Sequence, residues 1–113
     1  MMTTEQIVKE LELKVFTGEA LDSTELSGGY VSDLLSDVMG HAREGELWIT
    51  LQSHVNVLAI ASLKELAAVL LVKGIEPDMA VLEKAREEGV AILGTSEDTF
   101  TITGKLYQLL NKE

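Results

Sequence analysis

Residues 46–72 read ELWITLQSHVNVLAIASLKELAAVLLV, with an apolar segment at each end and a longer one between them. The first segment, residues 46–51, holds β-branched and aromatic residues bounded by a glycine and by polar residues, which predicts a strand. The last, residues 67–72, is uniformly apolar and predicts a second strand. Residues 54–66 are apolar nearly all round, which predicts a helix buried on every face, by its own sheet or by a partner subunit.

The alternation of strand and helix continues downstream of residue 72. Pro77 and Asp78 predict the start of a helix over residues 78–88, and Gly89 its end, because proline and aspartate suit a first turn and glycine a C-terminal cap. Residues 90–93 predict a short buried strand. Strands that alternate with helices in this way indicate right-handed βαβ units and a parallel sheet.

A last helix is predicted after residue 95. Ser96 is expected to cap it, with Glu97 and Asp98 in its first turn and Lys105 and Lys112 further along. This order of charges opposes the helix macrodipole at both ends.

The first part of the chain predicts shorter elements. Thr3 or Thr4 is expected to cap a helix at about residues 4–11, and residues 14–16 predict a strand. The polar residues 22–24 that follow predict an exposed loop.

Gly28 and Gly29 open a segment that predicts a strand running into a short helix through Met39, ended by Gly40 and Gly45. We therefore expect an α/β fold with a mostly parallel central sheet flanked by helices, formed by residues 1–113 as one domain.

Length, composition and charge exclude several functions. The chain has 113 residues, a size typical of one domain. Its 19 acidic and 9 basic residues give a formal charge of −10, which disfavours binding to nucleic acids and acidic membranes. It contains no cysteine, so disulfides and sulfur-ligated metals are excluded. No signal peptide and no apolar run long enough to span a bilayer are visible, so we expect a cytoplasmic protein.

Several segments in order resemble one known family. They are GGYVSDLLSDVM at 28–39, GIEPD at 74–78, Gly89-Val90 through Thr95, and Asp98-Thr99-Phe100. In sequence and spacing they are similar to the DRTGG domain, which is found beside CBS domains and is related to the amino-terminal domain of HPr kinase/phosphorylase. The resemblance implies an α/β domain that dimerises and serves regulation, often in proteins that sense adenine nucleotides.

Two departures limit what the resemblance implies. Where the family commonly has a Gly-Asp-Arg-like turn after the central strand, this chain has Gln52-Ser53-His54, so a charge-dependent role at that turn is in doubt. The phosphate-binding domain that carries catalysis in HPr kinase is missing, and no Gly-x-x-x-x-Gly-Lys-[Ser/Thr] loop occurs. Kinase activity is therefore not expected.

A ligand site is predicted where parallel strands end, because the turns there share one edge with the positive ends of helix dipoles. Three turns supply hydroxyls, amides, a lysine and a histidine for a small anion or a nucleotide. The candidate contacts are Gln52, Ser53, His54, Lys73, Gly74, Gly94, Thr95 and Ser96. The alternative is that Ser53, Asp78 and Ser96 only cap helices and that the glycines only permit tight turns.

Other polar residues offer weaker candidates. His41 and His54 lack the spacing of a metal site and a neighbouring nucleophile, so neither a metal, a cofactor nor a catalytic residue is predicted. The hydroxyl and carboxylate cluster of Ser32, Asp33, Ser36 and Asp37 is expected to cap the following helix, or else to form a partner surface. Tyr30, next to the two glycines, fits a ligand contact and a loosened start of a strand equally well.

Two hypotheses follow. The first is a non-catalytic, homodimeric regulatory module that binds a small ligand, such as an adenine nucleotide, at the carboxyl ends of its strands. The second is a docking subunit that binds a larger enzyme complex through its acidic surface and takes no small molecule.

Overall fold

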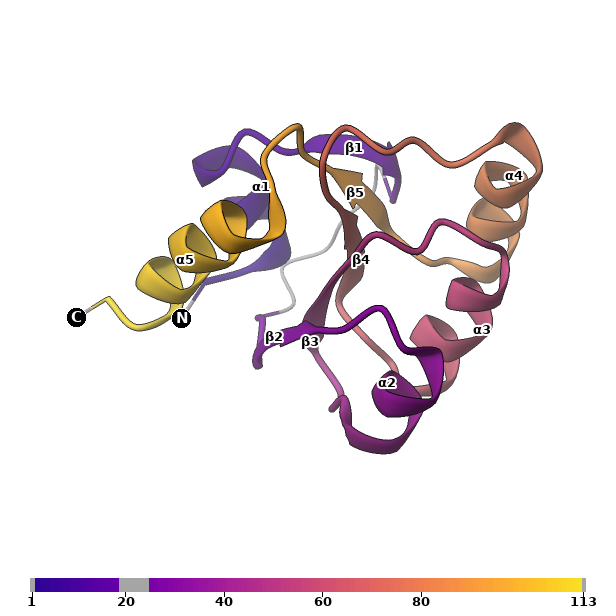
Figure 1. The fold of residues 1–113 in the computed structure, drawn as a ribbon, viewed down its shortest axis with the longest axis horizontal. Coiled ribbons are helices and arrows are strands. Elements are labelled where there is room, and N and C mark those ends of the chain that lie inside the picture. Colours follow the sequence, from indigo (N-terminus) through magenta and orange to yellow (C-terminus); the bar gives the residue numbers. More distant parts are fainter. Residues whose placement is uncertain (1, 19–24, 113) are drawn as a thin grey trace.

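The computed structural model describes residues 2–18 and 25–112. A five-stranded sheet lies between two layers of helices, with α1 and α5 on one face and α2, α3 and α4 on the other (Figure 1). The strands are β1 (Lys14–Thr17), β2 (Gly28–Val31), β3 (Glu46–Thr50), β4 (Ala68–Leu71) and β5 (Ile92–Gly94). The helices are α1 (Thr4–Glu10), α2 (Leu35–His41), α3 (Asn56–Leu63), α4 (Met79–Glu88) and α5 (Thr99–Leu110). The loop expected at residues 22–24 lies outside the described residues.

The sheet has the order β1-β5-β4-β3-β2. Strands β2, β3, β4 and β5 are parallel, and only β1 pairs antiparallel, with β5. The register between β1 and β5 shifts after Val15, and the buried Thr17 hydroxyl bridges the irregularity by donating to the Val90 carbonyl at 2.8 Å and accepting from the Ile92 amide at 3.0 Å. The predicted mostly parallel α/β sheet is confirmed.

The central strands are buried on both faces, which explains their uniformly apolar sequences. Alternate residues of each strand enter different core clusters: Trp48 packs towards α2, α3 and α4, whereas Leu47 and Ile49 pack towards α1 and α5. The indole N–H of the fully buried Trp48 donates to the Ser32 carbonyl at 2.8 Å. This bond ties the end of β2 to the core beneath α2.

Helix α3 is shorter and less buried than the sequence predicts. It spans Asn56–Leu63 rather than residues 54–66, and Val57, Leu58, Ile60 and Ala61 are its buried residues. Leu63 is 69% exposed. Within the chain the helix is not buried on every face, because the sheet and the neighbouring helices cover one side, whereas Val55, Ala59 and Leu63 on the other side are exposed. Cover of this second side by a partner subunit stays a prediction.

Three of the predicted helix ends are confirmed. The Thr3 side chain caps α1 and forms a capping box with Gln6. The Asp78 carboxylate caps α4 by accepting from the Val81 amide at 3.0 Å. Gly89 ends α4 in the left-handed conformation, with φ of 69°.

The start of α5 was predicted wrongly. Its cap is Asp98, which accepts from the Thr101 amide at 2.8 Å, and not Ser96. The Thr95 hydroxyl accepts from the Glu97 amide at 3.2 Å, so residues 95–97 form a turn before the helix begins. Glu97 therefore lies in this turn, where it pairs with Lys105 at 2.7 Å.

Helix α2 also differs from expectation at both ends. It continues through Gly40 to His41, so Gly40 does not end it. Its N-cap position is Leu34, and no side chain caps it. The expectation that a residue of the Ser32–Asp37 cluster caps this helix is therefore wrong. Asp33 instead accepts hydrogen bonds from Thr50 at the end of β3 and from Leu51.

Candidate ligand site at the carboxyl edge of the sheet

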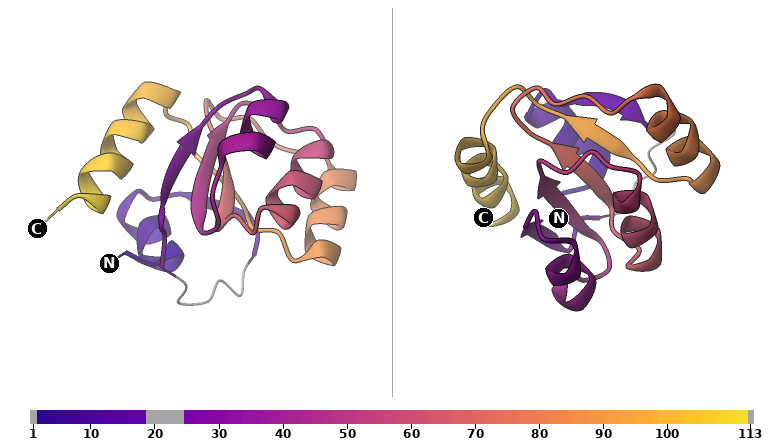
Figure 2. Two further views of the ribbon diagram at one scale, coloured as in Figure 1. Left: turned by 90° about the horizontal axis from the view of Figure 1, so that it is seen from below. Right: turned by 45° about the vertical axis from the view of Figure 1, so that its right-hand side comes forward.

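Four loops leave the sheet at its carboxyl edge, which we define as residues 32–34, 51–55, 72–78 and 95–98. They follow the parallel strands β2, β3, β4 and β5, so they lie on one side of the sheet, where helices α2 to α5 begin (Figure 2). All eight residues predicted to contact a ligand lie in these loops or directly before them. The sequence prediction that the three turns share one edge is therefore confirmed, while their contact with a ligand stays a prediction.

The loops after β2 and β3 are joined through Asp33. Its Oδ1 accepts from the Thr50 hydroxyl at 2.7 Å and from the Leu51 amide at 2.7 Å. The Gln52 side chain donates through Nε2 to the Asp33 carbonyl at 3.2 Å. Gln52 therefore lies where the sequence predicts it, with its amide group already engaged.

The loops after β4 and β5 are joined by their backbones. The backbone amide of Lys73 donates to the Glu97 carbonyl, and the backbone amide of Gly74 donates to the Thr95 carbonyl, both at 2.9 Å. Lys73 and Gly74 have φ of 59° and 71°, and the Ile75 amide returns to the Val72 carbonyl at 3.2 Å. This is a tight turn with two left-handed central residues, a conformation that costs a non-glycine residue about 1–2 kcal/mol.

The Lys73 side chain is exposed at the centre of this edge. Among the described residues, no carboxylate forms an ion pair with it within 4.0 Å. The pKa of Asp98 is nevertheless held below its ordinary value, first by the hydrogen bonds from Thr101 and also by the nearby positive charge of Lys73. Lys73 is therefore a cation in a strained backbone position, partly balanced by the carboxylate that caps α5.

His54 and Ser53 lie at the start of α3. The exposed His54 ring accepts from the Asn56 amide through Nδ1 at 3.1 Å. Helix α3 has Val55 at its N-cap position and no capping side chain, so the alternative role of Ser53 as a cap is wrong. This contact gives His54 a local role at the helix start.

Gly94 is explained by packing. A Cβ atom at this position would lie 2.5 Å from the Phe16 ring. Because real Cβ atoms do not approach other atoms so closely, the glycine is needed to seat Phe16 of β1 against β5. Gly94 is buried and shapes the edge from beneath.

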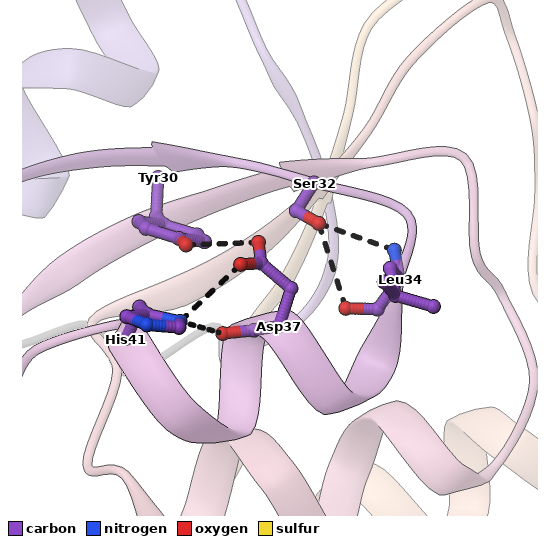
Figure 3. Close-up of polar contacts among 5 residues, drawn as sticks. All are labelled: Tyr30, Ser32, Leu34, Asp37 and His41. Carbon is purple, nitrogen blue, oxygen red and sulfur yellow. Dashed lines mark hydrogen bonds and ion pairs between the residues drawn. The ribbon is translucent and has the colours of Figure 1, made fainter.

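A polar cluster connects β2 to α2 through Tyr30, Asp37 and His41, which the sequence offered only as separate candidates (Figure 3). The Tyr30 hydroxyl donates to Asp37 Oδ2 at 2.8 Å, and His41 Nδ1 lies 3.3 Å from Asp37 Oδ1. The hydrogen bond from Tyr30 lowers the pKa of Asp37, and the same bond raises the pKa of Tyr30. The spacing of Asp37 and His41 by four residues was the one available signal.

The described residues contain no group of three or more histidine, aspartate or glutamate side chains placed to hold a metal ion. None of the described helices is long and apolar enough to cross a membrane.

Two hollows in the described surface lie away from the carboxyl edge. One lies at the opposite, amino edge of the sheet, among the turns that precede β3, β4 and β5. Another lies between α1, the start of β2 and the C-terminal end of α5.

Comparisons with known proteins give the following findings. A family model described as the DRTGG domain matches residues 6–109. The fold is similar to the crystal structure of the CBS and DRTGG domains of the regulatory region of Clostridium perfringens pyrophosphatase, complexed with its activator diadenosine tetraphosphate. The TM-score is 0.69 at 15% sequence identity, a likeness of fold. The match covers 93% of this chain and 45% of that one, so this chain spans less than half its length. No curated protein sequence matches this chain.

Proposed function

Because this chain belongs to the DRTGG domain family, we propose that it is a non-catalytic regulatory module that binds a small anion at its carboxyl edge. Adenine nucleotides are the first candidates. The observation that carries the proposal is Lys73, an exposed cation in a left-handed backbone conformation where the loops after β4 and β5 meet. Strain of this kind at a non-glycine residue is typical of functional positions.

The remaining contacts would come from both neighbouring loops. Gly74, Thr95 and Ser96 flank Lys73, and Gln52, Ser53 and His54 lie on the adjoining loop after β3. The chain carries a formal charge of −10, so a phosphate is repelled by most of its surface. The four loops of the carboxyl edge carry Lys73 and five carboxylates, of which Asp78 and Asp98 cap α4 and α5, so a phosphate would bind next to Lys73 and the uncapped start of α3.

The structural neighbour supports a regulatory role. It is the regulatory region of a pyrophosphatase and was crystallised with an activator that carries two adenosines and four phosphates. That region contains CBS and DRTGG domains, and the activator is a ligand of the whole region. An adenine nucleotide is therefore the ligand class to test first on this chain.

Isothermal titration calorimetry with AMP, ATP and pyrophosphate tests the proposal. Lys73→Asn removes the charge but keeps a residue that accepts the left-handed conformation. We expect it to weaken nucleotide binding by about tenfold or more, the effect of losing one charge-assisted contact. Lys64→Gln is the matched control, because Lys64 follows α3 at the opposite edge of the sheet. Equal affinities of both variants and the unmodified chain would show that the ligand does not bind at Lys73.

Self-association is part of the proposal. Four large apolar residues at the starts of α2, α3, α4 and α5 are exposed, namely Leu34 (65%), Val55 (38%), Met79 (66%) and Phe100 (90%). They surround the carboxyl edge, and burying them against a second copy would remove apolar surface from water. We expect light scattering to give the mass of a dimer at micromolar concentration and Phe100→Ser to shift it towards the monomer. A monomer at all concentrations would contradict this part.

The same exposed residues favour a second candidate function, docking on a larger enzyme complex without a small ligand. Thermal shifts separate the two, because any ligand that binds the folded state stabilises it. The absence of stabilisation by every nucleotide, together with one protein that co-purifies in fixed ratio, would favour docking.

A further inference from the structure

Strand β2 forms one edge of the sheet. Just before this strand begins, the Met2 carbonyl accepts a hydrogen bond from the Leu26 amide at 2.9 Å. Within residues 2–18 and 25–112, no strand pairs with the outer side of β2. The Ser32 amide donates to the Ile49 carbonyl of β3. Because successive residues of a strand point their backbone N–H and C=O groups to opposite sides, those of Gly29 point away from β3 and, within the described residues, are unpaired at the sheet edge.

The two glycines of β2 keep this backbone accessible. Neither has a positive φ, so the conformation does not demand glycine. A Cβ on Gly28 would lie 3.6 Å from Glu46 Oε2, which is ordinary contact, whereas one on Gly29 would lie 3.1 Å from the Leu106 side chain. Glycine within a strand weakens it, and it often marks a place where a ligand approaches the backbone closely.

A hollow of about 1030 Å³ opens onto this backbone between α1 and the C-terminal end of α5. This volume suits a small organic molecule. Tyr107 lines the hollow and is 68% exposed, so it offers an aromatic ring for stacking. Lys9, Lys112 and Glu10 also line the hollow, beside the negative end of the α5 dipole.

These features together suit a flat, uncharged heteroaromatic ring that carries a hydrogen-bond donor beside an acceptor. We propose that the hollow is a nucleobase site, distinct from the carboxyl edge, in which the base pairs with the outward backbone of Gly29 and stacks on Tyr107. A nucleobase carries such a donor and acceptor pair, and it stacks well on aromatic side chains. The sugar and any phosphate would lie towards solvent.

An amide chemical-shift titration of the ¹⁵N-labelled full chain with adenosine tests this site. We expect the largest changes at Gly28, Gly29 and the end of α5 with adenosine alone, because the base and not a phosphate makes the proposed contacts. Tyr107→Ala should weaken binding by about fivefold or more, the effect of losing one stacked base. Gln108→Ala is the matched control, since Gln108 is an exposed neighbour of Tyr107 on the same helix but does not line the hollow.

The outcomes separate this site from the proposed function. Changes confined to Lys73, Gly74 and Thr95 would overturn the nucleobase site and leave the carboxyl-edge proposal standing. Changes at Gly28 and Gly29, with none at the carboxyl edge for AMP or ATP, would do the reverse. Absence of any change at saturating adenosine, or equal affinities of Tyr107→Ala and Gln108→Ala, would also overturn the site.

Discussion

The carboxyl edge and the outer edge of β2 are two open surfaces of the same sheet, finished in different ways. At the carboxyl edge, the loops are joined to one another by backbone hydrogen bonds and by the Asp33 carboxylate. Along β2, Gly28 and Gly29 leave the backbone without side chains, and no described strand covers it. The first surface is held rigid by its own contacts, and the second has backbone groups still to be paired.

This difference shows how glycine can serve opposite purposes in one sheet. Gly94 is required because Phe16 fills the space that a side chain would need, whereas Gly28 has room for one. A side chain at Gly94 should therefore cost more stability than one at Gly28. The following predictions test this contrast.

The largest effect is expected at Gly94. Gly94→Ala should lower the free energy of unfolding by about 1–3 kcal/mol, because the Phe16 ring has to move to admit the Cβ. Gly28→Ala should change it by less than about 0.5 kcal/mol. Urea unfolding of both variants measures the difference. The Gly94→Ala, Phe16→Leu double variant should recover part of the loss, and equal costs at the two glycines would contradict the contrast.

A smaller loss is expected at Thr50, whose buried hydroxyl donates to Asp33. Thr50→Val keeps the shape but removes this bond, and should destabilise the chain by about 1 kcal/mol, because Asp33 keeps the Leu51 amide as a donor. Thermal unfolding followed by circular dichroism measures it. If the Asp33→Asn, Thr50→Val double variant loses as much as the sum of the single variants, the two residues do not act through one bond.

Lys73→Asn should have a small effect of opposite sign on stability. Asparagine tolerates the left-handed conformation better than lysine, so the variant should gain up to about 1 kcal/mol while nucleotide binding weakens. Stability and affinity measured on the same preparation check both effects. A variant that loses stability and affinity together would indicate a purely structural role for Lys73.

The last prediction concerns pH and the Tyr30–Asp37 pair. The folded state lowers the pKa of Asp37 below its ordinary value of 3.8, so the carboxylate stabilises the fold above that pH. This stability should be lost as pH falls through the lowered pKa. Asp37→Asn should therefore flatten the dependence of the melting temperature on pH in the acid range. Tyr30→Phe should move the acid transition to higher pH, because it removes the main cause of the shift.

The sequence could predict local structure wherever one short segment contains its own signals. Helix α1 begins at the capping box of Thr3 and Gln6, and α4 begins at the Asp78 cap and ends at the left-handed Gly89. All three signals act through contacts within a few residues. The start of α5 was missed because three successive polar residues, Ser96 to Asp98, all suit a cap. Hydrogen bonds from Lys73 and Glu97 to residues of the β5–α5 loop decide that residues 95–97 form a turn.

By itself, the sequence determined the elements of this protein, the parallel alternation of most strands, and the edge at which three polar turns meet. Periodicity and capping are local, and parallel strands joined by helices must end on one side. Only the tertiary structure decided that α3 is covered on one face, that Gly94 leaves room for the Phe16 ring, and that the Tyr30 hydroxyl donates to Asp37. These outcomes depend on which side chains from distant segments occupy the same space, and no short segment of sequence records that.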